Sequence, residues 1–173
     1  MIKKYNVKCL SLKERSVSLS RNIGAYNAKG GLLVFLDADT VISTDTIERI
    51  VKKLKTGPFF GTIKGVSENS EIKLVIVTEI KNIINLFIYW SNGLVYCRKD
   101  DFMKTNGFNV NLDRGELRMF FREISNYAKY VRLNTARVMT SQRRIKKFGI
   151  KKILYFWLRD YMKPIKKEYG AIR

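Results

Sequence analysis

The sequence predicts an α/β fold, in which strands alternate with helices and form a sheet covered by helices. Three observations support this prediction. The apolar run Leu32–Leu36 is continuous, which is typical of a strand buried on both faces of a parallel sheet. Segments with helical spacing precede and follow this run, and the pairs Gly30-Gly31 and Gly57-Pro58 separate them from the strands. The 173 residues are enough for one domain with a sizeable core.

The N-terminal part predicts a strand, a helix and a second strand. Val7–Leu12, "VKCLSL", is rich in strand-forming residues, and Ser20–Lys29, "SRNIGAYNAK", predicts a helix that ends at Gly30-Gly31. Leu32–Leu36 is the second strand. Such an order predicts a right-handed crossover between two parallel strands.

A second helix and a third strand follow. Asp45 is suited to the N-cap position and Glu48 lies three residues later, as in a capping box. Apolar residues then recur at helical spacing until Gly57-Pro58, and they are Ile47, Ile50, Val51 and Leu54. Phe59–Val66 predicts the next strand.

The segment from Glu71 to about Trp90 is long and strongly apolar. Charged residues interrupt it at Glu71, Lys73, Glu79 and Lys81 and leave less than the roughly 20 apolar residues that a membrane span needs. We therefore expect a core helix, with Ile72, Ile76, Ile80, Ile83, Ile84 and Phe87 on its buried side. Leu94–Arg98 predicts another strand, and Gly107-Phe108 predicts a turn.

The charge and composition of the chain limit which partners and which catalytic residues we expect. Lys and Arg number 34 against 15 Asp and Glu, so the formal charge is +19, which predicts an anionic partner: nucleic acid, nucleotide phosphates or a membrane face. The sequence contains no histidine, so catalysis would depend on carboxylates. Cys9 and Cys97 are far apart without zinc-site spacing, and no secretory signal is seen, so we expect a reducing cytoplasm.

Two acidic residues end the Leu32–Leu36 strand. Asp37 and Asp39 lie where open α/β sheets bind their ligands, beyond the carboxyl end of a strand. Their carboxylates offer two hard oxygen donors to a divalent cation, which in turn binds a diphosphate. Alternatively, the aspartates only form a turn, because such a short pattern also arises by chance.

Three motifs in order resemble the inverting family 2 glycosyltransferases of the GT-A fold. "SRNIGAYNAKGGLLVFLDADTVIS", Ser20–Ser43, is similar to the family's "ARNxG" helix and "FLDAD" strand. "NGFNVNLDRGELRMFFR", Asn106–Arg122, is similar to "GGF(D/N)…L..GED…..R". "TSQRRIKKFG", Thr140–Gly149, looks like the basic segment related to "QxxRW". The resemblance covers Val7 to about Gly149.

This resemblance implies metal-dependent transfer of a sugar, with inversion, from a nucleotide-diphosphate sugar to an acceptor hydroxyl. Asp37 and Asp39 would bind Mn²⁺ or Mg²⁺ on the diphosphate. The implied substrate-binding residues are Arg21, Asn22, Asp37, Arg122, Gln142, Arg143 and Arg144. Alternatively, Asn22 is a helix cap and the arginines are solvated. The resemblance leaves the acceptor open among a glycan, a protein and a lipid-linked acceptor.

The chain departs from the family pattern at two places. Family members begin with a strand and a "P.YNE" loop and then a second strand, whereas this sequence starts six residues before the strand that would be third. We therefore expect a shortened sheet with an uncovered edge. The sequence is then a fragment, an enzyme completed by a partner chain, or a reduced relative with altered binding. The family's acidic pair "ED", which supplies the catalytic base, is Glu116-Leu117 here. Because Leu117 cannot accept a proton, Glu116, or secondarily Asp113, is left as the catalytic base.

We expect a transferase domain over residues 1–149 and a basic amphipathic helix over 150–173. This helix is suited either to an anionic leaflet at the cytoplasmic membrane face or to packing on the sheet. Two alternatives to an active transferase remain. One is a catalytically inactive or partner-completed relative. The other is a nucleic-acid-binding protein, against which the dispersed basic residues argue.

Overall fold

The computed structural model describes residues 7–67, 71–87, 91–140, 147–152, 155, 159 and 165–166. The helices are α1 (Val17–Asn27), α2 (Thr46–Lys55), α3 (Ile72–Phe87), α4 (Lys99–Met103) and α5 (Glu116–Ile124). The strands are β1 (Leu32–Leu36), β2 (Thr40–Ile42), β3 (Phe59–Val66), β4 (Leu94–Arg98), β5 (Leu112–Arg114), β6 (Lys129–Thr140) and β7 (Ile165–Lys166).

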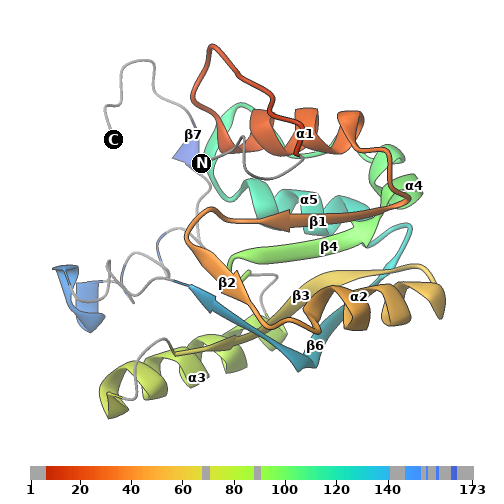
Figure 1. Ribbon diagram of the computed structural model, residues 1–173. Coiled ribbons are helices and arrows are strands. Elements are labelled where there is room, and N and C mark those ends of the chain that lie inside the picture. Colours follow the sequence, from red (N-terminus) through yellow and green to blue (C-terminus); the bar gives the residue numbers. More distant parts are fainter. Residues whose placement is uncertain are drawn as a thin grey trace.

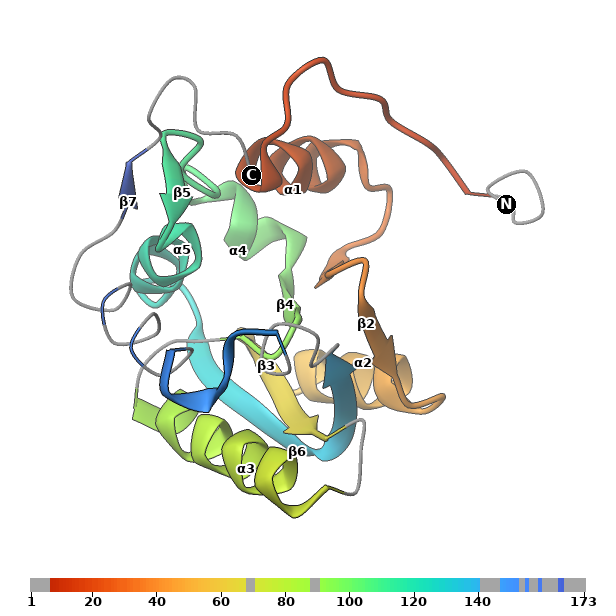
Figure 2. The same ribbon diagram turned by 90° about the vertical axis from the view of Figure 1, so that its left-hand side faces the viewer.

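Five of these strands form one mixed sheet in the order β1-β4-β3-β6-β2, and β5 pairs with β7 apart from it. The β3–β6 pair is parallel, while β1–β4, β3–β4 and β2–β6 are antiparallel. Helices α1, α4 and α5 lie on one side of the sheet and α2 and α3 on the other (Figures 1 and 2). The α/β fold class that the sequence predicts is therefore confirmed.

Each side of the sheet has its own apolar core. Beneath α1, α4 and α5, a cluster of aromatic rings fills the interior, formed by Phe60, Phe102, Phe108, Phe120 and Phe121. On the α2 side, Ile50 and Leu54 of the helix pack with Ile63 and Val138 of the sheet. The two cores hold the strand ends, where the polar residues lie, in fixed positions.

Local signals predicted several elements correctly. Strands β3 and β4 have the predicted bounds, and α2 begins directly after Asp45 and ends before Gly57. The Asp45 side chain makes no capping bond to the helix; it accepts hydrogen bonds from Ser43 Oγ (2.8 Å) and Arg49 Nε (2.7 Å) instead. The position of the N-cap was therefore predicted, but its contacts were not.

The predicted crossover unit is wrong. Residues Val7–Leu12 form no strand, and Val7 and Leu10 are exposed. β1 pairs with β4 and runs antiparallel to it. The prediction that both faces of β1 are covered holds, because Leu33 packs in one core and Val34 against the other. An apolar run reports burial, and the direction of the neighbouring strand does not follow from it.

The prediction of a core helix with its isoleucines inside is wrong for α3. Leu74, Val77 and Asn82 face the sheet, whereas four of the predicted core residues are exposed. These exposed residues are Ile72, Ile76, Ile80 and Ile83. Within the described part of the chain, no helix has both the length and the apolarity needed to cross a membrane.

The helix predicted over 150–173 does not continue to the C-terminus. Residues 150–152, 155 and 159 are helical, but Ile165–Lys166 is the strand β7, which pairs with β5. Pro164 lies just before this strand in the sequence, and proline removes a backbone donor that a continuing helix would need.

Candidate functional site

A tight turn at the end of β1 presents the two aspartates. The backbone N–H of Asp37 donates to the Gly93 carbonyl (2.9 Å), which fastens the end of β1 to the loop before β4. The Thr40 N–H donates to the Asp37 carbonyl (3.1 Å), so the chain reverses within four residues and enters β2. Asp37 is partly buried in this turn, and Asp39 is exposed at its tip.

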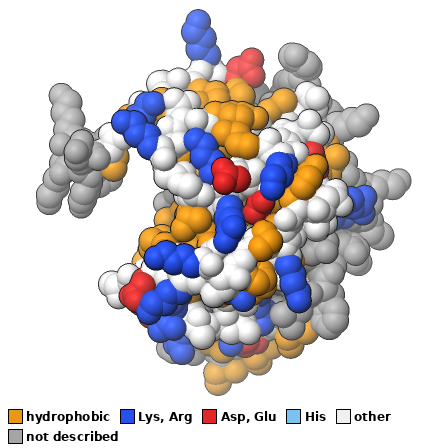
Figure 3. All heavy atoms as spheres, turned by 90° about the vertical axis from the view of Figure 1, so that its right-hand side faces the viewer, with side chains coloured by type: hydrophobic (Ala, Val, Ile, Leu, Met, Phe, Trp, Pro, Cys, Tyr) orange, Lys and Arg blue, Asp and Glu red, His pale blue; other side chains and the backbone are white. Residues whose placement is uncertain are grey.

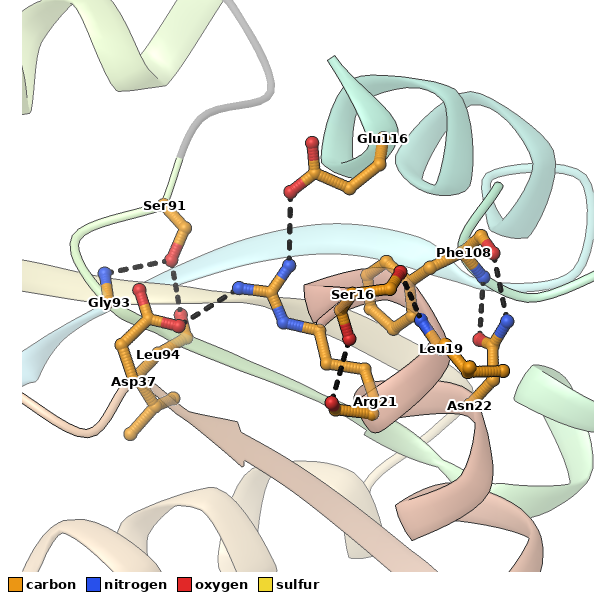
Figure 4. A network of polar contacts seen from close by, with 11 residues as sticks. Ser16, Leu19, Arg21, Asn22, Asp37, Ser91, Gly93, Leu94, Phe108 and Glu116 are labelled. Carbon is orange, nitrogen blue, oxygen red and sulfur yellow. Dashed lines mark hydrogen bonds and ion pairs between the residues drawn. The ribbon is translucent and has the colours of Figure 1, made fainter. Parts of the chain in front are cut away.

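Arg21 connects the two acidic parts of the site. From α1 its guanidinium donates to Asp37 Oδ1 (2.9 Å) and to Glu116 Oε1 (3.2 Å), as Figure 4 shows. The Arg21 side chain is 17% exposed, that of Glu116 18% and that of Asp37 45%. The guanidinium also lies 5.2 Å from the centre of the Phe108 ring. The site therefore combines one cation with two carboxylates that are 79 residues apart in the sequence (116 − 37).

Glu116 is aimed at Arg21 by the glycine before it. Gly115 has φ 85°, in the left-handed region that favours glycine, and it caps the start of α5. Glu116 occupies the first turn of that helix, where the backbone N–H groups favour a negative charge. Leu117, at the family's usual base position, packs against the aromatic core instead. Glu116 is therefore the carboxylate of α5 that contacts Arg21, whereas the side chain of Asp113, the secondary candidate, lies outside the description.

Asn22 joins α1 to the loop that precedes α5. Its Nδ2 donates to the Phe108 carbonyl (2.8 Å), and its Oδ1 accepts from the Phe108 N–H (2.8 Å). Gly107 beside it has φ 70°, and a Cβ at this position would lie 2.6 Å from Asn22 Oδ1. Asn22 is thus in the middle of α1 rather than at its cap, and its amide aligns Arg21 with the loop leading to Glu116.

The two aspartates offer carboxylate oxygens at one strand end. No cluster of three or more His, Cys, Asp and Glu side chains suited to a metal occurs among the residues the structure describes. Mg²⁺ is usually held by one or two carboxylates together with substrate phosphates and water. The carboxylates of Asp37 and Asp39 are oxygen donors of the kind that such a site uses, and Asp37 already accepts a hydrogen bond from Arg21.

Of the remaining predicted substrate-binding residues, Arg122 is described and is not part of this group. Arg122 is exposed in the last turn of α5, six residues and therefore about 9 Å along the helix from Glu116. Gln142, Arg143 and Arg144 lie outside the described residues. The contact of the Phe108 ring with Arg21 and the hydrogen bond from Asp37 to Gly93 were not predicted, because no sequence motif relates either residue to Asp37.

One edge of β1 has no partner strand among the residues that the structure describes, and it runs beside the site. Lys99 N–H donates to the Gly31 carbonyl (2.8 Å) and Asp37 N–H to that of Gly93, so the odd-numbered residues of β1 point their backbone groups at β4. The backbone groups of Leu32, Val34 and Leu36 consequently point the other way.

No described strand pairs with that free edge of β1. A groove of about 460 Å³ follows it, between β1 and one side of α1. Small residues of the helix line the groove, namely Ser20, Gly24, Ala25 and Ala28, together with Arg21. This edge is open to a further strand.

A mixed sheet flanked by helices, with an arginine between two carboxylates at one strand end, defines an α/β protein with a charged candidate site. The chain belongs to glycosyl transferase family 2, whose model matches residues 1–125. It therefore contains a glycosyltransferase domain, and membership implies the GT-A fold and sugar donor and acceptor substrates. Enzymes of this family commonly use divalent cations. No curated protein matches the chain.

Proposed function

We propose that this protein transfers a sugar, with inversion, from a nucleotide-diphosphate sugar to an acceptor hydroxyl, and that the reaction depends on a divalent metal. The observation that carries the proposal is the convergence of Asp37, Arg21 and Glu116 at the end of β1. A donor diphosphate needs cationic partners, and an attacking hydroxyl needs a nearby carboxylate.

The donor side of the site is Asp37, Asp39 and Arg21. Asp37 and Asp39 would hold Mn²⁺ or Mg²⁺, which neutralises charge on the leaving nucleoside diphosphate when bound. Arg21 donates two N–H groups in a planar fork, a geometry that suits phosphate oxygens as well as carboxylates. Its partial burial keeps it in position for a ligand at the strand end.

The acceptor side is Glu116. The acceptor oxygen forms a bond to the anomeric carbon on the face opposite the leaving group. The bond from that carbon to the phosphate oxygen breaks, and its electron pair leaves with the nucleoside diphosphate. The hydroxyl proton moves to the Glu116 carboxylate. Arg21 holds this carboxylate in place through its 3.2 Å contact.

Calorimetric titration with a panel of nucleoside diphosphates, with Mn²⁺ or with a chelator, tests the donor site. Binding should require metal and be lost in Asp39→Asn. Asp100→Asn, an equal change of charge at an exposed position on α4, should bind like the unchanged protein. Equal affinity in chelator would refute the role of the aspartates.

A turnover assay with Glu116→Gln tests the base. This variant should bind donor normally and lose at least about a hundredfold in kcat, because a positioned base contributes that much. Glu14→Gln, at an exposed site before α1, is the matched control. Unchanged turnover in Glu116→Gln would refute this assignment.

The free edge of β1 supports the partner-completed alternative. We propose that a strand of another chain pairs with the backbone of Leu32, Val34 and Leu36 and completes the donor pocket. If no nucleoside diphosphate binds the purified chain in either titration, this alternative is favoured over an active isolated enzyme.

A further inference from the structure

The outer side of α3 is an apolar stripe without a described partner. Ile72, Val75, Ile76, Ile80 and Ile83 recur at spacings of three and four residues, so they share one side of the helix. We call them the α3 stripe. Their exposed fractions are 75% for Ile72, 39% for Val75, 53% for Ile76, 40% for Ile80 and 58% for Ile83.

The stripe covers a continuous part of the surface. From Ile72 to Ile83 the helix advances eleven residues, or about 16 Å. α3 is the lowest element of Figure 1, and hydrophobic side chains occupy the lower rim of the molecule at this height in Figure 3. Single exposed apolar residues are normal, but contiguous patches mark interaction surfaces.

The opposite side of α3 is fixed to the sheet, so the helix cannot turn its stripe inward. Leu74 and Val77 are each 4% exposed. The Asn82 amide donates to the Gly65 carbonyl (2.8 Å) and accepts from the Gly65 N–H (2.9 Å). Rolling the helix would leave these buried backbone groups of β3 unpaired.

We propose that the α3 stripe inserts into the headgroup region of an anionic lipid bilayer, with the helix lying in the membrane plane. A helix that is anchored on one side and aliphatic on the other presents the geometry of an interfacial helix. This inference does not depend on the transferase function, since it concerns no residue of the donor or acceptor site.

The net charge of the chain favours this occupant over a second copy of the chain. Glu71 and Lys73 are both exposed beside Ile72, so the charges next to this residue offset each other. Exposed Glu79 pairs with Lys64 Nζ at 3.1 Å, which offsets its repulsion from anionic lipid. Two chains of formal charge +19 repel each other, whereas an anionic leaflet attracts each basic residue near its surface.

Flotation of the purified full chain with vesicles tests the proposal. One set consists of phosphatidylcholine alone, and the other contains about 30% phosphatidylglycerol to supply anionic charge. The double variant Ile76→Gln/Ile80→Gln removes apolar surface without changing charge, and glutamine preserves helix propensity. Ile47→Gln is the matched control, because Ile47 is 45% exposed on α2, outside the stripe.

The unchanged protein and Ile47→Gln should bind the anionic vesicles and not the neutral ones. The double variant should bind the anionic vesicles at least about tenfold more weakly, since two side chains no longer enter the apolar layer. Its circular dichroism and melting temperature should not change. Equal vesicle binding by the double variant would overturn the proposal. A concentration-dependent dimer in light scattering that the double variant abolishes would overturn it as well, in favour of a second copy.

Discussion

Removing Arg21 should destabilise the protein measurably, because this residue is the cation between Asp37 and Glu116. In Arg21→Ala both ion pairs are lost, at 2.9 Å and 3.2 Å. A hydrogen bond between charged groups contributes about 1.5–3 kcal/mol, and we take about 1.5 kcal/mol for Glu116, whose side chain is only 18% exposed. Asp37 is 45% exposed, so solvent screening reduces its share to about 0.5 kcal/mol. The sum is about 2 kcal/mol.

For a chain of this size, about 2 kcal/mol corresponds to a fall of about 4–8 °C in the melting temperature. Thermal unfolding followed by circular dichroism measures it. Lys52→Ala is the control, because the Lys52–Glu48 pair is short (2.7 Å) but highly exposed, and its loss should leave the melting temperature unchanged. Arg21→Lys should lie between, since an ammonium lacks the planar fork that reaches both carboxylates.

Equal melting temperatures for Arg21→Ala and Lys52→Ala would refute the reasoning. They would mean that the desolvation cost of the three charges cancels their attraction. Arg21 would then contribute to ligand binding alone, and the stability of the strand end would depend on the turn and the aromatic core.

Three further outcomes are expected. Gly107→Ala should lose about 2–4 kcal/mol in denaturant unfolding, since φ 70° disfavours a Cβ and the Cβ would collide with the neighbouring amide; a smaller loss would mean that the loop adjusts. At mildly alkaline pH, a thiol reagent should label exposed Cys9 and not Cys97, because burial raises the pKa of the Cys97 thiol; two rapidly labelled thiols would contradict this. Arg49→Gln should raise the Asp45 pKa in an NMR titration, because the hydrogen bond from Arg49 lowers it. The Arg49 pair thus stabilises the fold above the carboxyl group's ordinary pKa and loses this effect as pH falls through the lowered value; an unchanged titration would contradict it.

The elements that the sequence predicted well are those with local signals. β3 is bounded by Gly57-Pro58 and by polar residues, and the helical spacing of α2 buries Ile50 and Leu54 as expected. The failures concern relations between distant segments. The antiparallel pairing of β1 with β4 depends on contacts some 60 residues away, and the apolar run Leu32–Leu36 is compatible with either direction.

The candidate site shows the same difference between local signals and contacts of distant segments. Asp37, Arg21 and Glu116 were each selected from short motifs, but nothing in those motifs indicates that one guanidinium contacts both carboxylates. That contact depends on two glycines: Gly115, which turns the chain into α5, and Gly107, which allows the loop to approach Asn22. Positive φ angles and side-chain pairings with backbone arise from the folded geometry, so sequence spacing could identify the residues and not their arrangement.

The prediction that the isoleucine side of α3 is buried was wrong, and the orientation of the helix gives the reason. Its isoleucines favour burial by area alone. However, the N–H and C=O of Gly65 are covered by this helix, and leaving each without a partner costs about 1–3 kcal/mol. Asn82 satisfies both groups, and Asn92 Nδ2 donates to Asn82 Oδ1 (3.1 Å). The helix face that can satisfy the sheet is therefore buried, although it is less apolar. The aliphatic face of α3 remains outside because backbone hydrogen bonding in β3 requires the face that carries Asn82.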